Sequence, residues 1–516
     1  MKFYKLNVNL FKYLRETLRG LSLHFQDEIV PMSKIFLLIL LLCVSCSSFK
    51  GRRPADTGES RNNLINQARE IKDVVAQRDL NADTCEEMLT RINENYRDIS
   101  DSKVFLEQMK LEGEQILNEN FEARLALHSM LDVFPKVCRI KLKEVFANMR
   151  ATEDFVGVHF YNDPQIAAEN IKFEDQPIPV YEPEAYHPYH VGVGIDPKSK
   201  FEFKNGDIMI TKGVSFVSST ISEIAVPHSL FSHIVFVHVD EKTKKVTTME
   251  SYVGKGVGLY PIDLALKNEN SRILILRSRD AVLAARAANY MYERISKLKG
   301  DKKIIPYDYE LDFSDNSKLS CEEVAYDAFK TVSRGAFILP EIESEVTMTD
   351  ASFLKRVGIK NGMMMVPADM ETDSRFDIVL DWTDYRLMRD SWKKDAVLGE
   401  MLRWITEYKY TIHENLTSVA ARAIWSTRYI PGVWGMLSSL SGIPKDFAKD
   451  VPPLTIATMA SLKTIGGVLL PELKSYDQEY FQKNKTWPSS SQLRKTLDDF
   501  RKTEPKKLMK VFREKK

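Results

Sequence analysis

This chain has few cysteines, and its positive and negative charges nearly cancel. Both facts limit the classes of protein to which the chain can belong. The 516 residues include five cysteines, and 73 basic residues stand against 72 acidic ones, for a net charge of +1. This balance gives no bulk attraction to nucleic acid or to another polyanion, so we expect no nucleic-acid partner. The sequence also has no P-loop, no GxGxxG motif and no internal repeat, which argues against the common nucleotide-binding folds and against solenoids.

Long apolar runs are rare as well. Residues 454–470 are apolar and small, but Lys463 and a Gly-Gly pair interrupt them. A membrane-spanning helix needs about 20 mostly apolar residues, so we expect a buried helical hairpin here in preference to membrane insertion. Residues 35–42 form an unbroken apolar run that is too short to span a bilayer. With a charged start before it and small residues after it, this run is typical of a secretory signal.

The end of that signal resembles a bacterial lipobox. Cys46 directly follows the small residue Ser45, and the resemblance implies cleavage before Cys46 and lipidation of its thiol. We expect residues 1–31 to lie upstream of the true start, residues 32–46 to be the signal and residues 47–60 to be a tether. The expected location is the bacterial cell envelope, with the protein anchored to a membrane by its lipid and facing the periplasm or the exterior.

Beyond the predicted signal, which contains Cys43 and Cys46, the cysteines are Cys85, Cys138 and Cys321. An exported protein can form disulfides, and Cys85 and Cys138 both fall in a region with helical periodicity, so these two could pair, although sequence alone does not fix the pairing. Cys321 would then be an unpaired thiol in an exported protein.

Hydrophobic periodicity divides the remainder into three regions. Residues 61–155 have apolar residues at spacings of three and four, which predicts helices. Within residues 180–340 the period shortens to two, with strands expected around 233–239 and 246–252 and a helix from Asp280 onwards. Residues 374–505 again read as helical. Strands mixed with a few helices, without regular βαβ alternation, predict the α+β class.

The central region holds a possible nucleophile and base. Cys321 is placed where a helix is expected to begin, and a helix N-terminus lowers the pKa of a thiol. His233 opens a predicted strand and could take up the thiol proton as a general base. Glu250, on the next predicted strand, is the natural candidate to orient the imidazole. Cys321, His233 and Glu250 are therefore the predicted catalytic residues, expected to converge within hydrogen-bond reach.

The segments that carry these residues resemble a known family. They are Gly206–Ile208, Ser232–Val235, Met249–Ser251 with Gly254–Val257, and Tyr307–Tyr309 leading to Cys321–Val324. Their order is similar to that of the circularly permuted NlpC/P60 hydrolases, the YiiX/YebB-like group of papain-like cysteine amidases. The resemblance implies a permuted papain-like domain over residues 180–340, flanked by helical regions. It also implies Cys321 as nucleophile, His233 as base and Glu250 as the third polar residue.

Two positions depart from the family pattern. Val324 stands where the family's motif has leucine. Glu322 stands where the family's Cys-Ser-Glu-Leu motif has a small hydroxyl residue, whereas Glu323 matches the motif's glutamate. A carboxylate beside the thiol would raise the thiol pKa, which makes activation of Cys321 harder.

Three functions are compatible with these features. The first is an envelope-anchored thiol hydrolase that cleaves an amide bond, with cell-wall peptide as the expected substrate. The second is a thiol-dependent acyltransferase or esterase acting on a lipid-derived substrate, which the apolar stretch 454–470 would suit. The third is a non-catalytic binding module with a vestigial site.

The sequence predicts neither a cofactor nor a metal. His187 and His190 lie three residues apart, but Pro188 between them argues against a helix, and no further ligand lies at convincing spacing.

Overall fold

The computed structural model describes most of the chain beyond the predicted tether. Its described residues are 63–76, 82–97, 99, 105–161, 189–196, 199–267, 269–413, 416–430, 434 and 447–514. The predicted signal, Cys46, the tether and His187 lie outside the described residues. Residues 60–516 form one compact unit.

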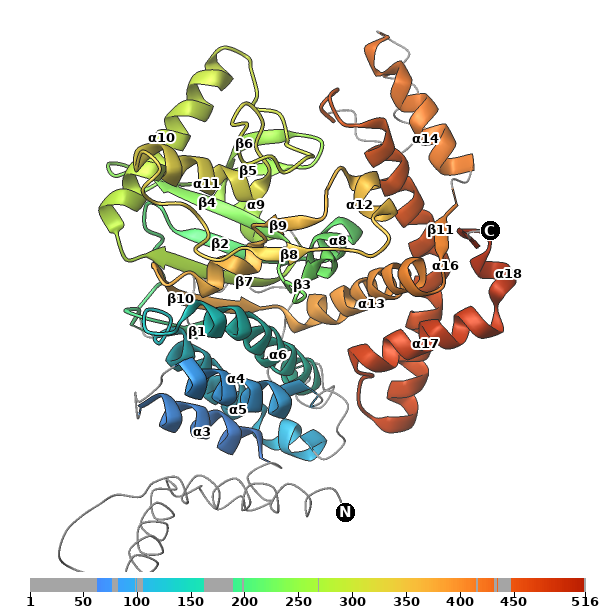
Figure 1. The fold of residues 1–516 in the computed structure, drawn as a ribbon, viewed down its shortest axis with the longest axis horizontal. Helices are drawn as coiled ribbons and strands as arrows, with labels where there is room; N and C mark the ends of the chain where they lie inside the picture. The colour runs from blue at the N-terminus through green and yellow to red at the C-terminus, as the bar shows by residue number, and fades with distance from the viewer. Residues whose placement is uncertain are drawn as a thin grey trace, which may run out of the picture. The chain divides into compact units, whose positions relative to one another are not determined.

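In the described N-terminal part of this unit there are four helices (Figure 1). They are α3 (Leu64–Ala76), α4 (Ala82–Arg97), α5 (Leu106–His128) and α6 (Lys136–Tyr161). In α3 the buried residues Leu64, Ala68, Ile71 and Val75 follow the spacing of three and four that brings side chains onto one helical face.

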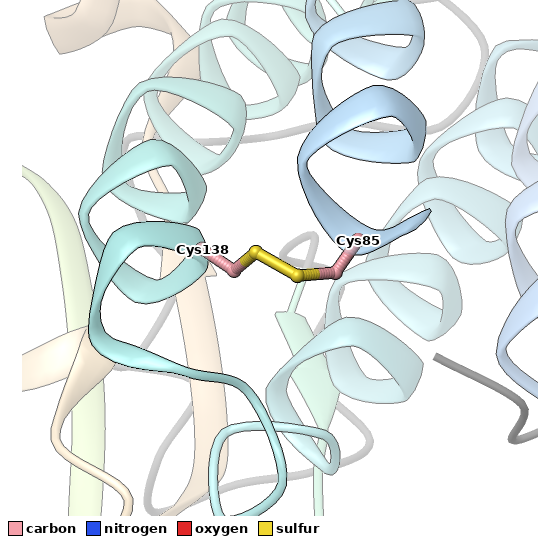
Figure 2. Close-up of a disulfide and its surroundings, with 2 residues drawn as sticks. All are labelled: Cys85 and Cys138. Carbon is pink, nitrogen blue, oxygen red and sulfur yellow. A yellow bond between two sulfur atoms is a disulfide. The ribbon is translucent and has the colours of Figure 1, made fainter. Parts of the chain in front are cut away.

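A disulfide ties two of these helices together. Figure 2 shows Cys85, near the start of α4, joined to Cys138, near the start of α6. Both cysteines are fully buried, and the chain between them includes all of α5. The sequence left open whether these two thiols pair or remain free, and in the structure they are paired.

The centre of the fold is a seven-stranded sheet with the strand order β1-β10-β7-β2-β4-β5-β6. Every neighbouring pair in this sheet is antiparallel. The strands are β1 (Tyr189–Val191), β2 (Ile208–Gly213), β4 (His233–Val239), β5 (Val246–Tyr252), β6 (Gly256–Pro261), β7 (Asn270–Ser278) and β10 (Phe376–Thr383). An antiparallel sheet combined with helical layers makes the protein α+β, as predicted.

Strand β10 corrects the expected boundary of the C-terminal helical region. Residues 376–383 were expected to be helical, but they pair with β7 and β1 inside the sheet. Both faces of β10 are covered: Phe376 and Ile378 enter one hydrophobic core, whereas Val379, Leu380 and Trp382 enter another. A strand buried on both faces has no apolar–polar alternation, so its period cannot be recognised in the sequence.

Helices cover the sheet on both faces. Helices α10 (Ala281–Gly300) and α11 (Cys321–Val332) pack on the face that carries Ile234 and Phe236. The short helix α9 (Ile262–Lys267) packs on the opposite face.

The turn before β2 needs a glycine. Gly206 has a φ of 94°, in the left-handed region, and a Cβ at this position would come within 2.6 Å of Ala284 in α10. The next residue, Asp207, accepts two hydrogen bonds from the Arg277 guanidinium, which fixes the turn to β7.

The other described elements are α8 (Phe216–Ile224), β3 (Ala225–Val226), β8 (Ser344–Val346), α12 (Ser352–Val357), β9 (Gly362–Met364), η6 (Pro367–Thr372), α13 (Tyr385–Glu407), β11 (Tyr410–Ile412), α14 (Leu416–Ser426), η7 (Thr427–Tyr429), α16 (Pro453–Asn484), α17 (Ser490–Thr503), α18 (Pro505–Leu508) and β12 (Phe512–Glu514). Most of them lie around a third core, which also contains buried side chains of α3 to α6. Met370 of η6 instead joins the core of Phe236, and Trp425 of α14 packs in a separate cluster with Val451. The N-terminal helices and the C-terminal helices α13, α16 and α17 therefore share one hydrophobic interior.

The apolar stretch 454–470 belongs to one long helix, α16, where the sequence had suggested a hairpin. The helix continues through Gly466, Gly467 and Pro471 because neighbouring helices pack along it. Among the residues that the structure describes, α16 is long and apolar enough to cross a membrane by length and composition alone, and 50% of its most apolar window is buried in the protein.

Candidate active site

Cys321 is the first residue of α11, as the sequence predicted. Ser320 caps the helix: its hydroxyl accepts from the N–H of Glu323, and the Glu323 carboxylate accepts from the N–H of Ser320 at 2.7 Å. This reciprocal arrangement is a capping box. The thiol therefore lies at a helix N-terminus, where unpaired N–H groups concentrate positive charge.

The thiol lies against the beginning of β4 and beside a carboxylate. It is 3% exposed, and it donates a hydrogen bond of 3.2 Å to Oε2 of Glu322. Burial, followed by the charge of Glu322, raises the pKa of Cys321 well above its ordinary value, although the N–H groups of Ile234 and of Cys321 itself oppose this by hydrogen bonding to the sulfur. Burial and the Glu322 charge therefore favour the thiol over the thiolate in this conformation.

His233 and Glu250 form a pair on the adjacent strands β4 and β5. Nε2 of His233 lies 3.0 Å from Oε2 of Glu250. Glu250 also accepts hydrogen bonds of 2.5 Å from the hydroxyls of Thr248 and Tyr252, and the Tyr252 ring stacks on the imidazole with 5.1 Å between centroids. Burial alone would raise the pKa of Glu250, but its bonds to His233, Thr248 and Tyr252 hold that pKa below its ordinary value.

The chain leading to Cys321 is tied to the strand that carries Glu250. Ser251 donates a hydrogen bond of 2.6 Å to the carbonyl of Leu319, two residues before the cysteine. The paired residues of β4 and β5 run from Phe236 with Met249 to Val239 with Val246. The first residues of β4 precede this ladder, and the N–H of Ile234, next to His233, is directed at the Cys321 sulfur.

The structure thus brings His233 and Glu250 into contact and places the Cys321 thiol beside the residue that follows His233. Within the described part of the chain, the thiol bonds to Glu322 and makes no hydrogen bond with the His233 imidazole. The catalytic role of the three residues therefore stays a prediction.

Several residues around these groups were missed in the sequence. Thr248 and Tyr252 share a face of β5 with Glu250, and the period of two along that strand would have identified them. Tyr307, in the loop before α11, is buried, and its pKa lies well above its ordinary value because of burial and then the neighbouring Cys321. No local pattern distinguishes this tyrosine from a structural one.

An apolar cavity adjoins Glu322, the residue that follows Cys321. Its volume is about 100 Å³, several times the 10–15 Å³ that one water molecule requires. Helices α8, α12 and α16 and strand β9 supply apolar walls, among them Val217, Ile221, Val357, Met459 and Leu462. Glu322, Tyr307 and Asp308 supply polar atoms to the same lining.

Metal ligation has little basis in the described residues. None of them belongs to a group of three or more histidine, cysteine, aspartate and glutamate side chains that could hold a metal ion. His190 lies in β1 and stacks on Phe121.

Comparison with known proteins leaves the chain without an assigned family. No protein-family model matches it, and no curated protein matches it either.

Proposed function

We propose that the protein is a thiol hydrolase with a circularly permuted papain-like domain of the NlpC/P60 type, cleaving an amide bond through an acyl-enzyme. The observation that carries the proposal is the pairing of His233 with Glu250 beside the strand segment against which the Cys321 thiol lies. A nucleophile near a base that is itself oriented by a third group is the arrangement that covalent hydrolysis requires.

In the proposed acylation step, the Cys321 sulfur forms a bond to the substrate carbonyl carbon while its proton passes to His233. The carbon–nitrogen bond then breaks, and His233 protonates the leaving amine. Because Glu250 engages Nε2 of His233, Nδ1 is the nitrogen that would exchange this proton. Water next hydrolyses the thioester, which releases the acid and restores the thiol.

Backbone N–H groups at the start of α11 are the proposed oxyanion donors. In the proposed mechanism they would donate to the carbonyl oxygen as negative charge develops on it, and fixed donors of this kind are often the largest single contribution to catalysis.

The proposed setting is the bacterial envelope, with the protein held to a membrane by a lipid on Cys46. The Cys85–Cys138 disulfide supports an oxidising compartment. Peptides of the cell wall are then the proposed substrates, and the membrane is the proposed partner of the lipid anchor.

Hydrolysis of a lipid-derived ester or amide is a second candidate. The apolar cavity that shares Glu322 with the thiol's surroundings favours it, because an acyl chain bound there would bring its carbonyl towards Cys321. A thiol acyltransferase would use the same acyl-enzyme with an acceptor other than water.

One experiment compares these candidates. The full chain is incubated separately with cell-wall peptide fragments and with long-chain acyl esters, and the released amine, acid or alcohol is measured by mass spectrometry. We expect cleavage of the peptides that disappears in Cys321→Ala. Cleavage of the esters alone would favour the lipid-directed hydrolase. If the folded protein cleaved neither substrate, both candidate functions would be contradicted.

A further inference from the structure

Glu322 occupies an unusual position for a carboxylate. It is the second residue of α11, it is 5% exposed, and its hydrogen bond comes from the thiol of Cys321 at 3.2 Å. Within the described ranges of the chain, no cation pairs with Glu322, and a buried carboxylate without a cationic partner loses much of its hydration energy. The hydrogen bond from the thiol offsets this loss only weakly.

The same residue lines the apolar cavity. Helices α8, α12 and α16 supply apolar side chains to the lining, and Glu322 is a lining residue of the same cavity. An apolar group entering this cavity would therefore meet Glu322 directly. Such a group further desolvates the carboxylate, which favours its movement towards water and away from the thiol.

Titratable groups beside the thiol lie on α11 and in the loop before it. Glu322 and Glu323 lie on α11 itself, and Asp308 and Tyr307 lie in the preceding loop. His233 on β4 and Glu250 on β5 bond to each other. Burial raises the pKa of Glu323 to about 8, and the Glu250 charge is directed to His233. Glu322 is the carboxylate that bonds to the thiol.

We infer that Glu322 is a positioning and specificity residue that holds the Cys321 thiol in its resting form, and that an apolar part of the substrate releases the thiol by entering the cavity and displacing the carboxylate. The inference rests on the proposed function, since the released thiol is the one that His233 would deprotonate. Such a release mechanism selects substrates in which an apolar group lies next to the reacting carbonyl.

The test measures alkylation of Cys321 by iodoacetamide as a function of pH. The full chain is used, and the modified Cys321 peptide is quantified by mass spectrometry, so the other cysteines do not interfere. Glu322→Gln keeps the shape of the side chain without its charge, and Glu322→Ser introduces the family's small hydroxyl. Glu345→Gln is the matched control, because Glu345 is an exposed carboxylate on β8.

We expect the alkylation profile of both Glu322 variants to move to lower pH by about one unit, equivalent to a rate on the order of tenfold higher at neutral pH. The Glu345→Gln profile should coincide with that of the unmodified chain. Identical profiles for the unmodified chain and both Glu322 variants would overturn the inference.

A second arm uses 1-octanol as an uncharged apolar probe. At neutral pH it should raise the alkylation rate of the unmodified chain severalfold and leave the Glu322→Gln rate unchanged. An unchanged or slower rate in the unmodified chain would overturn the release mechanism. Because alkylation needs neither a substrate nor His233, these outcomes are independent of whether any amide or ester is cleaved.

Discussion

At the scale of single residues, the imidazole of His233 is oriented by groups on the neighbouring strand. The Glu250 carboxylate accepts a hydrogen bond from Nε2 of His233. Tyr252 stacks on the imidazole ring, and its hydroxyl donates a hydrogen bond to Glu250. The sequence predicted the partners His233 and Glu250 because each opens or lies within a strand of clear period. It could not predict that the thiol bonds to Glu322, because that choice depends on how α11 and β4 meet.

The first prediction concerns Glu250→Gln. The substitution removes a charged hydrogen-bond acceptor that is fully buried, so the free energy of unfolding at pH 7 should fall by about 2 kcal/mol. Because the folded-state pKa of Glu250 is lowered, its stabilising contribution is complete above the unfolded-state pKa of about 4.5 and disappears as the pH falls through the folded-state value.

Thermal unfolding of Glu250→Gln and the unmodified chain across this pH range checks the prediction. The two midpoints should differ at neutral pH and converge in acid, whereas Glu345→Gln should differ little from the unmodified chain throughout. A difference that is constant with pH would show that the substitution acts by packing and not by charge.

At the scale of elements, the sequence predicted β4, β5 and α10 but neither β10 nor the single helix α16. Strands β4 and β5 and helix α10 follow their expected ranges. Strand β10 has no alternation of apolar and polar residues because both of its faces are buried. Helix α16 was mistaken for a hairpin because glycines such as Gly466 and Gly467 usually break helices. Tertiary packing overrides local preference in both elements.

The second prediction concerns the start of α11. Ser320→Ala removes the hydroxyl that accepts from the N–H of Glu323, and loss of such a cap should lower the free energy of unfolding by about 1 kcal/mol. Denaturant unfolding measures this loss. Ser320→Thr retains the hydroxyl and should recover most of the stability, so an equal loss in both variants would contradict a capping role.

At the scale of the whole molecule, the two helical regions that the sequence placed on either side of the sheet share one interior. Side chains as distant as Phe146, Trp404 and Leu469 belong to the same core. Buried ion pairs also connect the N-terminal helices to the rest of the protein. Arg124 of α5 bonds to Glu371 of η6 at 2.8 Å and pairs with Asp381 of β10. Such long-range contacts leave no local periodicity, so they could not be predicted from one sequence.

The third prediction concerns the disulfide. Cys85 and Cys138 are 53 residues apart, and closing a loop of this length in the unfolded chain is worth about 4 kcal/mol on chain entropy alone. The double variant Cys85→Ala with Cys138→Ala should unfold at a markedly lower temperature. Addition of a reductant should lower the midpoint of the unmodified chain and leave that of the double variant in place. A midpoint of the unmodified chain that does not respond to complete reduction would contradict this role.

The central claim is that Cys321 is a nucleophile activated by His233, and acyl-enzyme formation tests it most directly. The full chain is mixed with an activated acyl probe, quenched in acid at successive times, and the mass of the Cys321 peptide is followed. We expect one acyl adduct on Cys321, formed at least about 100-fold more slowly in His233→Ala, in line with the usual contribution of a general base. Acylation of Cys321 at the same rate in His233→Ala would contradict the account.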